Sequence, residues 1–174
     1  MSTSDPMSSA EMHRLERIAR DYHANPEVPD KHIEDLCQEY CGRWLVESLG
    51  GADKVLELGY GEGILTRSIV DSGRRLTVVE GADSLVRELR ERWKDRIQVE
   101  HALFETYDPG PERYEAVIAS HVLEHVADPV ALLQRIRQWL APGARLLVVV
   151  PNSESLHRKL AVLMGLQPGL DTLS

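Results

Sequence analysis

The chain has 174 residues, and 20 lysines and arginines against 28 aspartates and glutamates give it a net charge of −8. This length favours a single domain, and a composition of 43% apolar and 28% charged residues excludes a disordered or fibrous chain. The acidity argues against nucleic acid as a partner, because binding to phosphates needs a basic face. No apolar run approaches the roughly 20 residues that span a bilayer, and residues 1–9 are too polar for a signal peptide. We therefore expect a cytoplasmic protein without a membrane partner.

The first 50 residues predict a helical extension. Apolar residues at helical spacing indicate one helix over about 8–22, and a second runs from Asp30, a plausible N-cap, to Leu49 before Gly50 and Gly51 end it. Cys37 and Cys41 lie four residues apart in the second helix. We expect them to be small buried residues in a reducing compartment rather than part of a disulfide framework.

From residue 51 onward, short apolar strands alternate with helices. We expect strands over 55–58, 76–79, 97–99, 116–119 and 146–150, and helices over 64–70, 83–94 and 128–140, the last ending at Pro142-Gly143. Strands that are apolar on both faces and alternate with helices predict an α/β fold with a parallel sheet covered on both sides. The domain organisation expected is an extension over 1–50, a core over 51–152 and a further segment over 153–174, which contains a helix-like run over 155–166.

A glycine-rich segment lies where the first predicted strand ends and a helix begins. Its sequence, ELGYGEG over 57–63, contains three alternate glycines that allow a tight turn and close approach of a ligand: Gly59, Gly61 and Gly63. A dinucleotide fingerprint would have glycine where this chain has Ile64. The carboxylate of Glu57 would repel a pyrophosphate but attract an ammonium group. The pattern therefore favours a cofactor that carries an amino acid, and an NAD-dependent oxidoreductase is a less favoured alternative.

An acidic residue ends the second predicted strand. Glu80 lies 23 positions after Glu57 and is followed by Gly81. A carboxylate at the tip of the neighbouring strand can accept hydrogen bonds from both hydroxyls of a ribose. We therefore expect Glu80 to hold the ribose of a nucleotide cofactor.

Four segments together resemble the class I S-adenosylmethionine-dependent methyltransferases, particularly the small-molecule branch. They are ELGYGEG over 57–63, Glu80, SHVLEHVADP over 120–129 and LAPGA over 140–144. The resemblance covers about residues 55–152. It implies a Rossmann-like, doubly wound and mostly parallel sheet, and methyl transfer from S-adenosylmethionine to a small-molecule acceptor by direct displacement, giving S-adenosylhomocysteine. Oxygen, nitrogen and carbon acceptors all remain open.

The resemblance also implies roles for individual residues. The three glycines would surround the methionine and ribose of the cofactor, with Glu80 and Gly81 at the ribose, Leu103 and Phe104 beside the adenine, and Ser120 and His121 beside the sulfonium and methionine tail. Tyr60 stands where the family usually has a small residue, and we expect its side chain to point into the cofactor or acceptor pocket. The amino-terminal extension would fold over the cofactor, and residues 153–174 would begin a lid over the acceptor.

His121, Glu124 and His125 also match the H-x-x-E-H pattern of inverted zinc peptidases, in which the histidines bind the metal. The motif directly follows a buried strand and precedes another helix start at Asp128 and Pro129 by only three residues, so one helix does not easily contain it. We expect no metal site, and a zinc hydrolase is the least favoured function. His121 is instead a candidate general base for an acceptor hydroxyl, and His125 a weaker one. The alternative that neither is essential stays open, because methyl transfer depends mainly on proximity and alignment.

A complete sheet of this family has two further strands, one of them antiparallel, and these 174 residues contain no segment for them. We expect the chain to be part of a longer protein. The other explanation is a homodimer or a partner chain that completes the sheet, which leaves a second function open: a partner subunit that binds the cofactor but is catalytically inactive.

Overall fold

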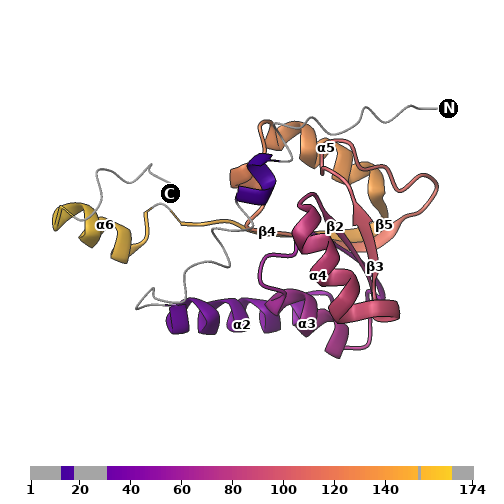
Figure 1. The fold of residues 1–174 in the computed structure, drawn as a ribbon, viewed down its shortest axis with the longest axis horizontal. Coiled ribbons are helices and arrows are strands. Elements are labelled where there is room, and N and C mark those ends of the chain that lie inside the picture. Colours follow the sequence, from indigo (N-terminus) through magenta and orange to yellow (C-terminus); the bar gives the residue numbers. More distant parts are fainter. Residues whose placement is uncertain (1–12, 18–30, 153, 166–174) are drawn as a thin grey trace.

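The computed structural model describes residues 13–17, 31–152 and 154–165. Five strands form one parallel sheet, in the order β3-β2-β1-β4-β5 (Figure 1). Their bounds are β1 Lys54–Leu58, β2 Arg75–Glu80, β3 Gln98–His101, β4 Tyr114–Ser120 and β5 Leu140–Val149. The predicted parallel sheet is therefore confirmed.

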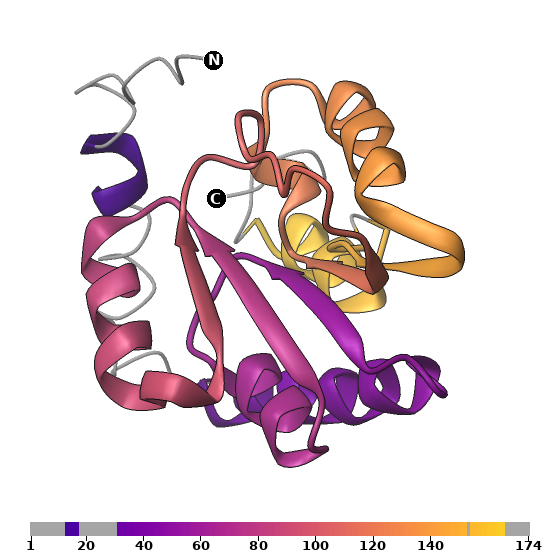
Figure 2. The same ribbon diagram turned by 90° about the vertical axis from the view of Figure 1, so that its right-hand side faces the viewer.

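Helices cover both faces of this sheet (Figure 2). The covering helices are α2 Lys31–Ser48, α3 Ile64–Asp71, α4 Asp83–Trp93 and α5 Pro129–Trp139. The chain also forms two short 3-10 helices, η1 Lys94–Arg96 and η2 Leu123–His125, and a helix α6 Leu156–Leu163 that extends away from the sheet (Figure 1). One core cluster joins α2, α3 and α4 to one face of the sheet, and a second joins α5 to the other face. This arrangement confirms the doubly wound, Rossmann-like fold. Residues 13–17 are also helical, whereas the rest of the helix predicted over 8–22 lies outside the described residues.

Local sequence signals explain where the helix α5 begins. The side chain of Asp128 accepts a hydrogen bond from the backbone N–H of Ala131 at 2.9 Å, and Pro129 occupies the first turn. Both are preferred at a helix amino terminus, where N–H groups lack partners within the helix. The predicted start of this helix is confirmed.

The beginning of β5 differs from the prediction. The strand starts at Leu140, directly after α5, and not at residue 146. Leu140 pairs with Tyr114, and the next pair joins Arg145 to Ala116, so residues 141–144 bulge out opposite a single residue of β4. Gly143, at φ +78°, takes the left-handed conformation within this bulge. The Pro-Gly pair thus interrupts the pairing of a strand instead of ending a helix.

The carboxyl end of α2 is held against the core by two arginines. Arg145 of β5 donates a hydrogen bond to the carbonyl of Ser48 at 2.8 Å, and Arg74 donates to the carbonyls of Gly50 and Ala52, each at 2.9 Å. Cationic donors stabilise a helix carboxyl end, whose last carbonyls have no partners in the helix. They fix α2 in place, and one flank of this helix lines the site described below.

Within the described residues, β5 pairs only with β4 and its other edge carries no strand. The side chains of Val148 and Val150 are exposed, and so are those of Leu156 and Leu163 of α6. Across the described part of the chain, no helix combines the length and apolar character needed to cross a bilayer.

Candidate functional site

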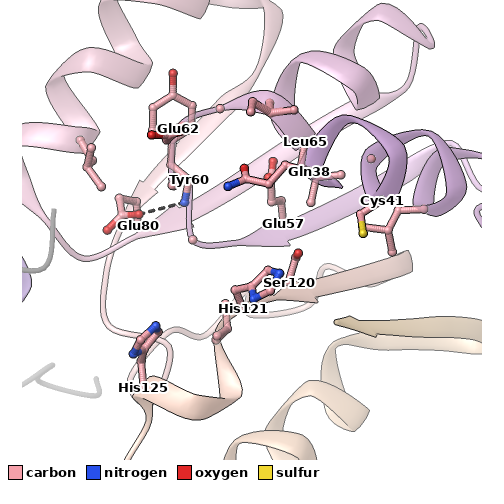
Figure 3. Close-up of a pocket in the computed structure, with 18 of the residues that line it drawn as sticks. Gln38, Cys41, Glu57, Tyr60, Glu62, Leu65, Glu80, Ser120, His121 and His125 are labelled. Carbon is pink, nitrogen blue, oxygen red and sulfur yellow. Dashed lines mark hydrogen bonds between the residues drawn. The ribbon is translucent and has the colours of Figure 1, made fainter. Parts of the chain in front are cut away.

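A cavity of about 300 Å³ lies at the carboxyl ends of β1, β2 and β4 (Figure 3). Strand order reverses between β1 and β4, and open α/β sheets bind ligands at such a switch point. The volume falls at the lower end of the range typical of small-molecule sites. Ten residues expected at the site line this cavity: Glu57, Gly59, Tyr60, Gly61, Gly63, Glu80, Phe104, Ser120, His121 and His125.

The glycine loop between β1 and α3 needs glycine at each of its three alternate positions. Gly59, Gly61 and Gly63 have φ values of +77°, +53° and +74°, in the left-handed region that other residues rarely adopt. The N–H of Gly63 donates to the carbonyl of Tyr60 at 3.0 Å, which closes the turn. No side chain caps the amino terminus of α3, so this end of the helix faces the cavity with its backbone.

Glu80 holds the glycine loop to the end of β2. Its Oε1 accepts hydrogen bonds from the N–H groups of Gly81 and Ala82, both at 2.8 Å, and its Oε2 accepts one from the N–H of Tyr60 at 3.0 Å (Figure 3). A carboxylate has about four acceptor positions, so one position on Oε2 remains for a ligand. Glu80 is thus both a structural anchor of the loop and a candidate hydrogen-bond acceptor in the cavity.

Glu57 is a buried carboxyl group in the wall of the cavity. It is 2% exposed, and its Oε2 accepts a hydrogen bond from the hydroxyl of Thr66 at 2.9 Å. Burial raises its pKa from 4.5 to about 8; the Thr66 hydrogen bond opposes this rise and the negative charge of Glu80 adds to it. Glu57 is therefore largely protonated at neutral pH, and a cation placed beside it would favour its ionised form.

The side chain of Tyr60 is held against α4. Its hydroxyl donates to Glu88 at 3.1 Å and accepts from Arg92 at 3.1 Å, both on this helix. Its ring packs on Gly63, where an added Cβ would lie 2.5 Å from the ring. The ring therefore fastens the glycine loop to α4, which the sequence did not indicate.

The histidines follow β4. His121 comes directly after the strand with φ +55°, and His125 ends η2, so no single helix carries both. Among the described residues, no set of three histidine, cysteine, aspartate or glutamate side chains is arranged to hold a metal ion.

Two expected residues, Gly81 and Leu103, do not line the cavity. Gly81 lies against Leu103 and against Leu15 of the helical residues 13–17. A Cβ at Gly81 would lie 2.7 Å from Leu15 Cδ1 and 3.5 Å from Leu103 Cδ2, so this glycine leaves the space in which Leu15 docks.

Residues 13–17 bridge the two sides of the cavity. Leu15 lines it. Glu16 accepts a hydrogen bond from the N–H of Ser84 at 2.9 Å, at the start of α4, and Arg14 donates to the carbonyl of His125 at 3.5 Å. Burial alone would raise the pKa of Glu16, but the hydrogen bonds from Ser84 and the charge of Arg87 hold it below its ordinary value.

Sequence reasoning also missed the wall formed by α2. Cys37, Gln38 and Cys41 lie on one flank of this helix and line the cavity. Cys37 is exposed and Cys41 half-buried, so the expectation that both are buried is wrong. Their four-residue spacing indicated a shared face, but not that this face borders a cavity.

The charge of the cavity indicates what it can bind. The described residues that line it include Glu57, Glu62 and Glu80 but no lysine or arginine. A pyrophosphate would find no cationic partner among them, whereas an ammonium or sulfonium group would be attracted. The glycine cradle, the buried carboxyl group and Glu80 therefore fit a nucleoside with a cationic amino-acid tail.

Comparison with known proteins identifies similar sequences. A family model described as a methyltransferase domain matches residues 12–168. The ubiquinone biosynthesis O-methyltransferase of Xanthomonas oryzae pv. oryzae (strain PXO99A) is 31% identical over 141 residues, which are 79% of this chain and 58% of that protein. The protein of the same name from Xylella fastidiosa (strain M23) is 31% identical over 143 residues, 80% of this chain and 55% of that protein. The chain thus spans little more than half the length of these curated relatives.

Solved structures share the fold. The CcbJ methyltransferase from Streptomyces caelestis superimposes with a TM-score of 0.63 at 24% identity, covering 77% of this chain and 55% of that one. A structure described as a DhpI-SAM-HEP complex superimposes with a TM-score of 0.62 at 23% identity, covering 94% of this chain and 73% of that one.

Proposed function

The chain belongs to the class I S-adenosylmethionine-dependent methyltransferases, and on that basis we propose that it binds S-adenosylmethionine and transfers its methyl group to a small-molecule acceptor. The observation that carries this proposal is the acidic cavity at the switch point of the sheet, with its glycine cradle and the carboxyl groups of Glu57 and Glu80. The product would be S-adenosylhomocysteine.

We assign the cofactor contacts from the chemistry of the cavity walls. Glu57 would pair with the ammonium group of the methionine tail, and the free acceptor position of Glu80 would take a ribose hydroxyl. Phe104 would pack beside the adenine, and Ser120 and His121 would lie near the sulfur. S-adenosylmethionine, when bound, supplies a methyl group already activated on a sulfonium, so the protein mainly has to align the acceptor and exclude water.

Residues 13–17 would form part of a lid over the cofactor. Their support is the hydrogen bond of Glu16 to one side of the cavity and of Arg14 to the other, with Leu15 between them. A strap anchored on both sides encloses a ligand without requiring a rearrangement of the sheet.

The acceptor is proposed to be a small molecule. The curated relatives are named ubiquinone biosynthesis O-methyltransferases, and another protein with this fold is named a glycopeptide N-methyltransferase. The absence of lysine and arginine among the described cavity residues supports a neutral or cationic acceptor over a phosphorylated one.

The test is methyl transfer by the purified chain. Methyl-labelled S-adenosylmethionine is incubated with a panel of small phenols, catechols and amines, and label in the acceptor is measured beside S-adenosylhomocysteine. We expect both products in equal amounts, and their loss in Glu80→Ala but not in Glu91→Ala, which changes an exposed glutamate on α4. Binding of S-adenosylhomocysteine without transfer to any member of the panel would instead support the catalytically inactive subunit.

A further inference from the structure

A strained histidine stands at the mouth of the cavity. His121 directly follows β4 and has φ +55°, a left-handed conformation that is uncommon for residues other than glycine. Its backbone N–H donates to the carbonyl of Val149 on β5 at 2.9 Å, which holds the strained turn in place. The ring is 42% exposed and faces the cavity (Figure 3). Strain of this kind is kept where the surrounding structure enforces it, and it is concentrated at functional sites.

A buried carboxyl group lies behind this ring. The side chain of Glu124 in η2 is only 9% exposed, and its Oε1 is 3.4 Å from Nδ1 of His121. Its other oxygen, Oε2, is buried and has no hydrogen-bond partner within the described residues. Burying a carboxyl group with an unsatisfied oxygen is costly, so the position needs a reason beyond packing.

We propose that His121 and Glu124 form a dyad that takes the proton from the acceptor, in which Glu124 is the positioning residue. Nδ1–H would face Glu124, which leaves the lone pair of Nε2 directed into the cavity. The paired carboxylate also stabilises the imidazolium that forms when Nε2 takes a proton, as an acidic residue behind a histidine does in other enzymes. This inference rests on the methyl-transfer function proposed above.

The dyad defines the class of acceptor as a neutral hydroxyl compound. As the acceptor oxygen forms its bond to the methyl carbon, the hydroxyl proton moves to Nε2, and the bond from that carbon to sulfur breaks with its electron pair left on sulfur. The positive charge thus passes from the sulfonium to the imidazolium, which returns its proton to water. An ionised carboxylate would have no proton to give, and the negative charge of Glu80 in the cavity would repel it.

The tautomer of His121 tests this arrangement without an acceptor. Long-range ¹H–¹⁵N spectra of the ¹⁵N-labelled chain at pH 8.5, well above the roughly 6.5 of an ordinary imidazole, report which ring nitrogen is protonated; the His121 signals are assigned by their loss in His121→Asn. We expect Nδ1 protonated and Nε2 unprotonated in the wild type. Glu124→Leu should remove this preference, and the control Glu91→Leu, at an exposed site on α4, should keep it.

Either of two results would overturn the dyad: a wild-type His121 protonated on Nε2, or an unchanged Nδ1–H tautomer in Glu124→Leu. The first needs no variant and does not depend on the folding of any mutant. Calorimetric titration of the same wild-type sample with S-adenosylhomocysteine separates the two proposals. Binding together with the Nε2–H tautomer rejects the dyad alone, whereas the Nδ1–H tautomer without binding rejects the methyl-transfer function and with it the role of the dyad.

Discussion

Replacing Gly63 by alanine tests how the glycine loop is fastened. The new Cβ would lie 2.5 Å from Cε2, 2.6 Å from the hydroxyl oxygen and 2.7 Å from Cζ of Tyr60, at a backbone φ of +74°. The left-handed conformation costs an alanine about 1–2 kcal/mol, and an overpacked contact with a buried ring adds about 1–3 kcal/mol. We therefore expect Gly63→Ala to lower the free energy of unfolding by about 2–5 kcal/mol, measured by urea denaturation.

Gly61 is the matched control. It has φ +53°, but an added Cβ would meet no atom within 4 Å, so Gly61→Ala should cost only the backbone term of about 1–2 kcal/mol. In a Tyr60→Ala background the cost of Gly63→Ala should fall to the same value, a coupling of about 1–3 kcal/mol. An equal cost of Gly63→Ala with and without the tyrosine ring would refute this description of the loop.

Three further predictions concern the acidic residues of the site. Because the pKa of Glu57 is raised from 4.5 to about 8, the folded protein keeps a proton that the unfolded chain releases, and the stability of the ligand-free protein should decline as pH rises between these values. Glu57→Gln should flatten this part of a plot of urea midpoint against pH. An identical slope in the variant would contradict the raised pKa of Glu57. Glu80→Gln places an amide N–H₂ where carboxylate oxygens accept three backbone hydrogen bonds, so it should lower the free energy of unfolding by about 1–3 kcal/mol and weaken the binding of S-adenosylhomocysteine. An unchanged affinity for S-adenosylhomocysteine would show that Glu80 is not part of the cofactor site. Glu16→Ala deletes the acceptor of the Ser84 N–H and should lower the free energy of unfolding by about 0.5–2 kcal/mol, whereas Arg17→Ala, at the exposed neighbouring position, should have little effect. Equal losses of stability in the two variants would show that Glu16 does not anchor residues 13–17.

The core strands and helices were predictable because each carries its own local signal. Short runs of residues that are apolar on both faces predicted the strands, and Asp128 with Pro129 predicted the start of α5. The start of β5 was not predictable in this way, since Pro142 and Gly143 signal a break whether they end a helix or bulge out of a strand. Only the pairing of Leu140 with Tyr114 decides between the two.

The site was predictable where residues close together in the sequence form it, as in the glycine loop, and at Glu80, which directly ends a predicted strand. It was not predictable where distant segments meet. The direction of the Tyr60 side chain depends on Glu88 and Arg92, and the cavity wall formed by Cys37 and Cys41 depends on how α2 packs against the sheet. Glu124 illustrates the same limit: the sequence shows it only as part of an H-x-x-E-H motif that we did not expect to bind metal, whereas the structure places its buried side chain 3.4 Å from the ring of His121.

The most direct test of the central claim is calorimetric titration of the 174-residue chain with S-adenosylhomocysteine, with NAD as the control ligand. The acidic cavity predicts saturable binding of S-adenosylhomocysteine at one site and none of NAD. Ionisation of Glu57 on pairing with the ammonium group also predicts proton release at pH 7, seen as a binding enthalpy that changes with the ionisation enthalpy of the buffer. Binding of NAD in preference, or no binding of S-adenosylhomocysteine to the folded chain, would contradict the account.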